Sequence, residues 1–510
     1  MAELKRPVIV HPFLFAILPI LFLYSHNAGE LYLSQLAAPL LVAGLSSLLL
    51  WWALSLIFRD RRRAALLSSL FWVWFFSFGH LHRLVMRSPA ADLAAPKTAI
   101  FVAIYWTLLL IGAGFLIVQR RGATGLSSML NIAAGVVVAW HALTIGGYEF
   151  KRVLAYQRLR QAGRINLIDP ARAGVCPNIY YIILDGYGRA DVLRDIYHYD
   201  NRPFLQYLTR KGFHVVPQAQ AGYCQTALSL AAGLNMEYLD RVAARVGVSS
   251  NDLAPLAKMI EHNRLFKLLR PRGYRIVAFS SEYAPLDLRS ADIYLGGRSR
   301  LTEFQRVTLA TTPLPVLLGA GALESNYQPH AQAVLYTFEH LADTTRLKPP
   351  VFVFAHIMCP HPPFVFGPDG PDTPRELRFR KDELREYVEQ VQFVNRQTQR
   401  AVDALLAAAR WPTVIIIQSD HGPSSRTDWF SVERTDARER LGALVACYLP
   451  GGDLRLDDDL SSVNLFRIVL NRYFGANLPL LPNDSYYSTS GQPYRFVRVT
   501  DDAVAGARKQ

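Results

Sequence analysis

The residues best suited to chemistry follow two apolar runs that lie more than 200 residues apart. Asp420 and His421 come just after the run Thr413–Gln418. Asp185 directly follows the run Ile179–Leu184. Dense runs of Val, Ile and Leu are typical of strands buried on both faces of a parallel sheet. Ligands of such sheets bind at the carboxyl ends of the strands, so we expect the three side chains to meet at one site.

Asp185, Asp420 and His421 together offer two carboxylates and an imidazole. These oxygen and nitrogen groups are ligand types that hold Zn²⁺ or Mn²⁺ in proteins. The sequence therefore predicts one divalent metal ion, Mn²⁺ or Zn²⁺, and the oxygen-rich set favours Mn²⁺. For Asp420 taken alone, the alternative is a cap of the following helix or turn.

A nucleophile is expected in the segment Gly222–Asn235, where Thr226 stands at the start of a short predicted helix. The unpaired amides and the dipole of a helix N-terminus favour an alkoxide and a bound phosphate oxygen. A nearby metal ion would lower the pKa of the hydroxyl further. The alternatives are Thr226 as a plain N-cap, or Ser229 or Cys224 as the nucleophile.

Two histidines lie in the segment His356–Phe364 at the end of another apolar run. The second, His361, is followed by two prolines, which stiffen the loop and can hold an imidazole over a substrate. We predict a catalytic or substrate-binding role for His361. Substrate contacts are also predicted for His356, Ser229 and Arg189, and the alternative for the histidines is a purely structural role.

From about Gly174 onward, strand-like and helical patterns alternate. This alternation predicts an α/β domain with a mainly parallel central sheet. Predicted helices include Leu253–Leu269, with Asp252 as N-cap, and Asp382–Arg410. The expected strands are Ile179–Leu184, Phe213–Pro217, Tyr274–Ser280, Val351–His356, Thr413–Gln418 and Ala443–Leu449.

The first 150 residues contain five apolar segments long enough to cross a bilayer, which requires about 20 residues. The segments are Val8–Tyr24, Leu36–Phe58, Ala64–Leu84, Thr98–Val118 and Gly125–Ile145. Basic residues concentrate at one set of ends and predict that those ends are cytoplasmic. They are Lys5, Arg6, Arg59, Arg61, Arg62, Arg63, Arg120 and Arg121. Everything after Tyr148 is then expected on the outer face of a bacterial-type inner membrane, and the alternative for the first segment is a signal peptide.

These patterns predict a transmembrane domain over residues 1–148, an amphipathic juxtamembrane linker over 149–174 and an extracytoplasmic catalytic domain over 175–510. The apolar stretch Val307–Leu323 is broken by prolines and is either a loop packed on the core or a surface resting on lipid. All four cysteines lie in the outer portion, where disulfides are permitted. The alternative is four buried thiols.

Both parts of the chain are basic. Residues 1–150 hold 11 Lys and Arg against 5 Asp and Glu, and the remainder holds 44 against 36. A basic outer domain suits anionic substrates such as phospholipid headgroups or phosphorylated glycans. Nucleic acid is not an expected partner, because an outward-facing domain does not normally meet it.

The order of these motifs resembles the sulfatase-like branch of the alkaline phosphatase superfamily. The motifs are Asp after the first soluble strand, Thr with Ser three residues later, His-x-Pro-Phe, and Ser-Asp-His-Gly. With five leading spans, the chain looks most like lipoteichoic acid synthases, membrane phosphoglycerol transferases and lipid A phosphoethanolamine transferases. The resemblance implies Asp185, Thr226, Asp420 and His421 as metal ligands, with Thr226 also as nucleophile and His361 on the substrate or leaving group.

Some positions depart from this pattern. Sulfatases have Cys-x-Pro-Ser-Arg where this chain has Cys224-Gln225-Thr226-Ala227, so sulfate ester hydrolysis is not expected. The main hypothesis is a membrane phosphotransferase that moves a phosphoglycerol- or phosphoethanolamine-type headgroup from a lipid donor to a glycan or lipid acceptor through a phospho-threonine. The alternatives are a sulfatase-like phosphodiesterase that acts on an envelope ester, and a non-catalytic scaffold.

Overall fold

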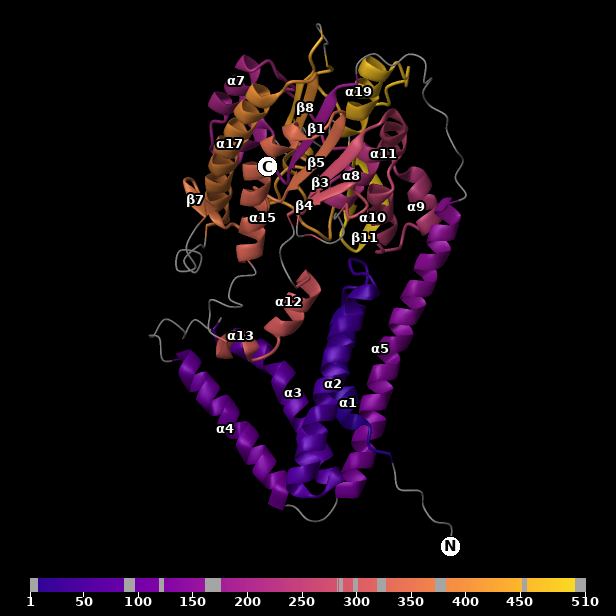
Figure 1. The fold of residues 1–510 in the computed structure, drawn as a ribbon, viewed down its shortest axis with the longest axis vertical. Helices are drawn as coiled ribbons and strands as arrows, with labels where there is room; N and C mark the ends of the chain where they lie inside the picture. Colours follow the sequence, from indigo (N-terminus) through magenta and orange to yellow (C-terminus); the bar gives the residue numbers. More distant parts are fainter. Residues whose placement is uncertain are drawn as a thin grey trace. The chain divides into compact units, whose positions relative to one another are not determined.

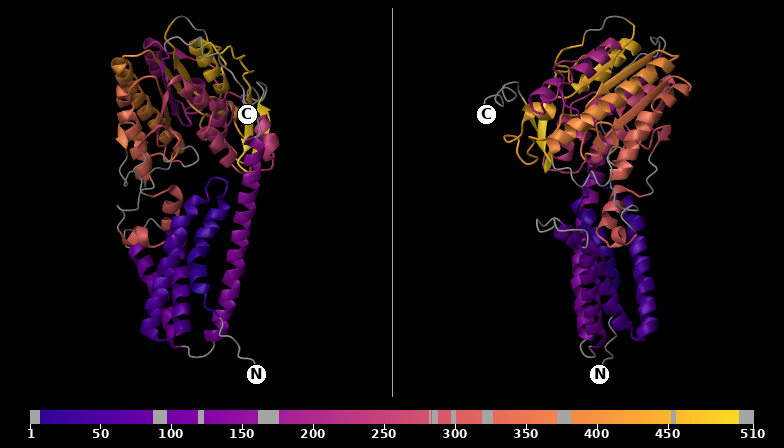
Figure 2. Two further views of the ribbon diagram at one scale, coloured as in Figure 1. Left: turned by 45° about the vertical axis from the view of Figure 1, so that its right-hand side comes forward. Right: turned by 90° about the vertical axis from the view of Figure 1, so that its left-hand side faces the viewer.

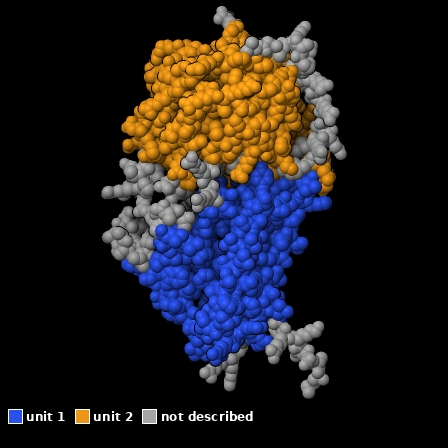
Figure 3. Space-filling view, in the orientation of Figure 1, with its two compact units in different colours: residues 1–153, 300–326 blue, residues 154–299, 327–510 orange. Residues whose placement is uncertain are grey.

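The structure is a computed structural model of the 510-residue chain. It describes residues 8–86, 97–118, 123–160, 176–281, 283, 288–296, 301–318, 327–371, 382–451 and 456–499. Two compact units are present, one made of residues 1–153 and 300–326 and the other of residues 154–299 and 327–510 (Figure 3). Lys5, Arg6, Arg120, Arg121 and the linker residues 161–174 lie outside the described residues. The domain boundaries expected at 148 and 175 stay predictions.

The first unit is built from the predicted apolar helices. They are α1 (His11–His26), α2 (Ser34–Phe58), α3 (Arg61–Met86), α4 (Lys97–Val118) and α5 (Ala123–Arg160). Helices α2 to α5 are long and apolar enough to cross a membrane, and α1 is shorter, with 16 residues. Helices α1, α2 and α3 contact one another, and α4 contacts α3 (Figure 1). Many large apolar side chains point outward, for example Leu49 and Leu110, as expected for helices surrounded by lipid.

A segment from the second half of the chain also belongs to this unit. It forms α12 (Glu303–Ala310) and α13 (Leu314–Leu317). The Phe304 side chain is buried in the same core as Tyr24 of α1. The described part of the Val307–Leu323 stretch therefore packs against the apolar helices, and residues 319–323 lie outside the description.

The second unit contains a seven-stranded sheet in the order β2-β9-β8-β1-β5-β3-β4. Its strands are β1 (Asn178–Leu184), β2 (His214–Val215), β3 (Arg275–Phe279), β4 (Ile293–Leu295), β5 (Val351–Ile357), β8 (Thr413–Gln418) and β9 (Val445–Tyr448). Strand β1 pairs in parallel with both β5 and β8, and β3 pairs in parallel with β4 and β5. Within the described sheet, β9 pairs antiparallel with both of its neighbours, β2 and β8. The prediction of a mainly parallel sheet is confirmed.

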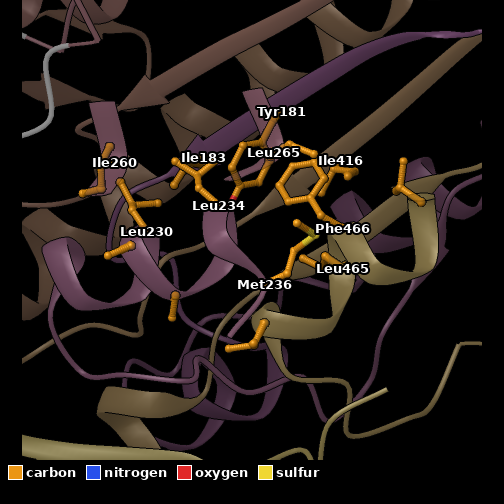
Figure 4. Packing of buried hydrophobic residues seen from close by; sticks show 14 of the residues in the cluster. Tyr181, Ile183, Leu230, Leu234, Met236, Ile260, Leu265, Ile416, Leu465 and Phe466 are labelled. Atoms are coloured by element: carbon orange, nitrogen blue, oxygen red, sulfur yellow. The ribbon is translucent and has the colours of Figure 1, made fainter. Parts of the chain in front are cut away.

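Helices cover both faces of this sheet, which is why its central strands β1, β5 and β8 are buried at every residue (Figure 2). One face packs against α8 (Thr226–Asn235), α10 (Ala254–Glu261), α11 (Arg264–Leu269) and α19 (Leu465–Phe474). The other face packs against α7 (Arg202–Arg210), α15 (Tyr327–His340) and α17 (Glu383–Ala408). Figure 4 shows Tyr181 and Ile183 of β1 packed with Leu230 and Leu234 of α8 and with Phe466 of α19.

Two local details differ from simple sequence expectations. The predicted helix Leu253–Leu269 is two helices, because the first ends at Glu261 and the Asn263 side chain accepts a hydrogen bond from the Phe266 amide to begin the second. All four cysteines are free thiols. Cys224, Cys359 and Cys447 are buried, which agrees with the alternative of small apolar side chains.

Candidate active site

The sheet brings the predicted metal ligands together. Strands β1 and β8 are parallel neighbours, with Ile183 opposite Gln418, so their carboxyl ends stop at one edge. One ligand atom from each of Asp185, Asp420 and His421 lies within 4.8 Å of the others, and all three side chains are buried. The expected juxtaposition of two strand ends therefore holds in the folded chain.

The carboxylate of Asp185 is held on one side by His356. His356 Nε2 lies 3.0 Å from Asp185 Oδ2, and both side chains are buried. Burial acts to raise the pKa of Asp185, but the nearby His361, His356 and His421 imidazoles lower it below its usual range. Within the described residues, Asp185 Oδ1 is buried and has no hydrogen-bond partner. One oxygen of the carboxylate is thus fixed and the other is left for a ligand.

Asp420, like Asp185, has one carboxylate oxygen in a hydrogen bond and one without a hydrogen-bond partner. Its Oδ1 accepts a hydrogen bond from the Gly186 amide at 3.2 Å, and its Oδ2 is buried with no hydrogen-bond partner in the described chain. The Ser229 hydroxyl donates to the Asp420 carbonyl at 2.7 Å. Asp420 therefore does not serve as a simple helix cap, and Ser229 fixes the backbone of a candidate ligand.

The His421 ring is oriented by its own backbone neighbour. Nδ1 lies 2.9 Å from the Gly422 carbonyl, so this nitrogen carries the proton and donates. Nε2 then presents its lone pair toward the carboxylates, 3.2 Å from Asp420 Oδ2. Burial is the main cause that lowers the pKa of His421 to about 4, which keeps the ring neutral near pH 7.

Gly422 allows the chain to turn tightly behind this ring. A Cβ atom at Gly422 would lie 1.9 Å from the Glu439 carbonyl oxygen, a distance that no side chain tolerates. The Gly422 amide also donates to the Arg440 carbonyl at 2.8 Å. The glycine of the Ser-Asp-His-Gly motif is therefore required by close backbone packing against the segment around Arg440.

Thr226 is the first residue of α8, and its hydroxyl faces the cluster. Thr226 Oγ1 lies 3.0 Å from His421 Nε2, whereas Gln225 occupies the N-cap position. The alternative of Thr226 as a plain N-cap is therefore wrong. Cys224 is fully buried with its thiol against the Ser488 carbonyl, and burial raises the pKa of this thiol, so it is a poor nucleophile.

The four groups fit a divalent metal ion. One oxygen each of Asp185 and Asp420 is buried without a hydrogen-bond partner among the described residues and lies close to His421. The Thr226 hydroxyl contacts His421 Nε2 at 3.0 Å. Buried carboxylate oxygens are costly unless a cation or a donor satisfies them. Three oxygen ligands and one imidazole suit Mn²⁺ and Zn²⁺ alike.

His361 lies beside the cluster on the loop after β5. Its amide donates to the Asp185 carbonyl at 3.0 Å, and its ring centroid is 6.3 Å from that of His421. Gln390 of α17 donates to the carbonyls of Pro360 and His361 and so fixes the loop. His361 also lines a pocket of about 40 Å³ next to the cluster, together with Gly186 and Arg440.

Arg440 is a candidate site residue that the sequence analysis missed. It comes from α18 (Ala437–Leu441), and its guanidinium donates to the carbonyls of Cys224 and Gly422 at 2.8 and 2.9 Å. In the part of the chain that the structure describes, no carboxylate forms an ion pair with Arg440, although the side chain is buried. The Trp429 ring lies 4.8 Å from the guanidinium carbon. A buried cation without an anionic partner suits an anionic substrate group.

His330 of α15 is a second residue that sequence reasoning missed. Its Nε2 is buried, and no described residue hydrogen-bonds to it. Burial is the main cause that lowers its pKa to about 4, and the charges of His361 and Asp185 also act on it. No pattern in the sequence marks this histidine, because it follows neither a strand end nor a recognisable motif.

Arg189 and His356 were predicted to contact the substrate, but both side chains bond to other groups of the protein. The Arg189 guanidinium forms a two-pronged ion pair with Asp191, at 2.6 and 3.0 Å, and also donates to backbone carbonyls. His356 is fully buried behind Asp185. These arrangements favour structural roles for both residues over contacts with the substrate.

The sequence profile of the sulfatase family, described as Sulfatase, matches residues 177–451. More than half of the chain is matched, and the chain belongs to this family. It is accordingly a sulfatase-superfamily enzyme, a transferase or a hydrolase, preceded by apolar helices that fit a membrane protein. A search of curated proteins finds no match.

Solved structures similar to this chain include a phosphoethanolamine transferase and a sulfatase-type protein. The lipooligosaccharide phosphoethanolamine transferase A of Neisseria meningitidis is 12% identical, with a TM-score of 0.40 over 91% of this chain and 95% of its own. The C-terminal periplasmic domain of EptC from Escherichia coli, solved in complex with Zn, is 10% identical with a TM-score of 0.45 over 66% and 96%. A sulfatase-type protein of Bacteroides fragilis is 13% identical, with a TM-score of 0.40 over 65% and 83%.

Proposed function

We propose that this protein is a metal-dependent membrane phosphotransferase. It moves a phospho-headgroup of the phosphoglycerol or phosphoethanolamine type from a lipid donor to a hydroxyl of a glycan or lipid acceptor. Thr226 carries the group as a phosphate ester between the two steps. The observation that supports this most is the 3.0 Å contact of Thr226 Oγ1 with His421 Nε2, beside two carboxylate oxygens that have no hydrogen-bond partner among the described residues.

Asp185, Asp420, His421 and Thr226 are the residues that would hold the metal ion. A divalent ion bound there would lower the pKa of the Thr226 hydroxyl and offset negative charge on a phosphoryl group. Hydrogen bonds orient three of these ligands. Asp185 bonds to His356, Asp420 bonds to the Gly186 amide, and His421 bonds to the Gly422 carbonyl.

In the first step, Thr226 Oγ1, which has released its proton to solvent and reacts as an alkoxide, attacks the phosphorus of the donor. A bond forms between Oγ1 and phosphorus, and the bond between phosphorus and the lipid oxygen breaks. His361 gives a proton to the departing oxygen, which leaves as the hydroxyl of a diacylglycerol. In the second step, His361 takes a proton from the acceptor hydroxyl, whose oxygen attacks phosphorus, and the bond between phosphorus and Oγ1 breaks to release Thr226 as the alkoxide.

Arg440 is the residue best placed to hold a phosphoryl oxygen during both steps. Its guanidinium spans the loop before α8 and the loop after β8, because it bonds to the Cys224 and Gly422 carbonyls. It also lines the same small pocket as His361. A fixed guanidinium in a site shielded from water stabilises developing charge more strongly than one in solution.

A lipid donor is favoured by the membrane helices. An enzyme anchored beside the bilayer meets headgroups at a high local concentration. If the basic connection at residues 59–63 is cytoplasmic, as the positive-inside rule predicts, the catalytic unit faces outward and cytoplasmic nucleotides are not available to it.

The test uses the full-length protein in vesicles of phosphatidylglycerol and phosphatidylethanolamine with labelled headgroups. We expect diacylglycerol to be released, the label to appear on an added envelope glycan or lipid acceptor, and Thr226→Ala to abolish both. Label recovered only as free phospho-alcohol at an unchanged rate without acceptor would instead identify a phosphodiesterase. No release of diacylglycerol under any metal condition would leave the scaffold alternative.

A further inference from the structure

The first unit contains a groove of about 310 Å³ that is separate from the catalytic residues. Its walls come from α1, α2 and α3 on one side and from α12 and α13 on the other. Lining side chains include Ile20, Val42, Phe76 and Leu309. The volume is at the lower end of the range for ligand pockets, roughly 300 to 1,000 Å³, so it suits one slender ligand segment.

The wall made by α12 is built into the unit. Gly79 of α3 donates to the Thr311 carbonyl at 2.9 Å, and a Cβ atom at Gly79 would lie 2.0 Å from the Ala310 carbonyl oxygen. The close approach of the two backbones therefore requires glycine. Phe304 of α12 packs edge-on against Tyr24 of α1, with 6.1 Å between the ring centroids. These contacts fix the segment that forms this wall of the groove against α1 and α3.

The inner surface of the groove is apolar in its chemistry. No lining residue is charged. The Thr308 and Thr312 hydroxyls each donate at 2.7 Å to a carbonyl of the same segment, so their hydrogen-bonding capacity as donors is already used. A headgroup or a peptide backbone would find few partners there, whereas a hydrocarbon chain needs none.

The groove is continuous with the lipid-facing surface. Val42 lines it and is 64% exposed, and it belongs to an outward apolar face of α2 that also includes Leu41, Leu45 and Leu49. In a spanning helix such a face contacts acyl chains. The α2 lining residues lie in the half of the helix that is farther from the basic connection at 59–63. The positive-inside rule assigns that half to the outer leaflet.

We infer that the groove binds one acyl chain of an outer-leaflet phospholipid. Its identification as a tail of the donor lipid rests on the proposed function. The segment 301–318 then gives this chain a binding site for the apolar part of a lipid, in addition to the polar site around Thr226.

The experiment uses the full-length protein in phosphatidylglycerol and phosphatidylethanolamine vesicles that contain a trace lipid with a diazirine on one acyl chain. After illumination and digestion, we expect labelled peptides from α2 and from residues 301–314. Val42→Trp fills the groove and should lower this labelling about tenfold, the change that ~1.4 kcal/mol of lost binding produces. Leu49→Trp is the matched control, because Leu49 is 63% exposed on the same helix but does not line the groove.

Equal labelling in Val42→Trp and Leu49→Trp would overturn the inference, as would labelling no stronger on these peptides than on α4. Crosslinks from the groove to a second protein chain would also overturn it. Thr226→Ala should keep the labelling, since the groove is independent of the chemistry. Labelling without headgroup transfer would refute only the proposed function, and transfer without labelling would refute only the acyl-chain site.

Discussion

His356 Nε2 lies 3.0 Å from Asp185 Oδ2, and the other oxygen of this carboxylate has no partner in the described chain. The buried histidine thereby determines which way the carboxylate faces. Burial acts to lower the pKa of His356, but the hydrogen bond to Asp185 and the charges of Asp185 and Asp420 together outweigh it, so the pKa is raised. A histidine that supports a ligand in this way orients it without touching the substrate.

His356→Gln should therefore weaken metal binding while leaving the sheet folded. Loss of such a supporting hydrogen bond typically lowers metal affinity by about 10- to 100-fold. Titration of the metal-free protein with Mn²⁺ and Zn²⁺ measures this change. His262→Gln is the control, because His262 is exposed and away from the site. An unchanged affinity in His356→Gln would show that Asp185 does not need this support.

Thr226→Ala should abolish turnover, since no other hydroxyl lies against His421 Nε2 in the described structure. The expected loss is on the order of 10⁴-fold or more, as for other nucleophile deletions. Ser229→Ala and Cys224→Ala should retain measurable activity, because both side chains are buried and bond to carbonyls. A Thr226→Ala enzyme with near wild-type rates would move the nucleophile to Ser229.

Arg440→Lys should lower kcat and leave metal affinity unchanged. Lysine keeps the charge but cannot hold two carbonyls and a phosphoryl oxygen with one planar group. Removing one such donor typically costs about 10²- to 10³-fold in kcat. The melting temperature of the variant separates this effect from unfolding, and Arg434→Lys is an exposed control. A fully active, folded Arg440→Lys protein would exclude Arg440 from phosphoryl binding.

Metal binding should be insensitive to pH across the neutral range. Burial is the main cause that lowers the pKa of His421 to about 4, so the neutral, ligating form persists as pH falls through the usual histidine pKa near 6.5. Protonation, and with it metal release, is expected only as the pH approaches 4. Elemental analysis of protein equilibrated between pH 4 and 8 measures occupancy. Loss of half of the bound metal already near pH 6.5 would contradict the lowered pKa of His421.

The site core was predictable because it follows strand ends. The runs before Asp185 and Asp420 are buried at every residue and largely apolar, since helices cover both faces of β1 and β8. Parallel pairing then fixes their carboxyl ends side by side. Thr226 was recognisable for a similar reason, because it begins a helix in a segment rich in small residues.

Other features depend on tertiary packing that leaves no periodic signal. Arg440 reaches the site from a five-residue helix, and only its burial against the Cys224 and Gly422 carbonyls reveals its place. His330 follows an apolar insertion instead of a strand. The insertion itself packs on the apolar helices through a backbone contact at Gly79, which a sequence pattern cannot display.

The most direct test of the central claim is the mass of the Thr226 peptide after the protein has reacted with phosphatidylglycerol or phosphatidylethanolamine vesicles without acceptor and been quenched in acid. We expect an added phosphoglycerol or phosphoethanolamine group on Thr226. The added group should be absent from Thr226→Ala and should be lost when acceptor is supplied. An unmodified Thr226 peptide in a protein that releases diacylglycerol at full rate would contradict it.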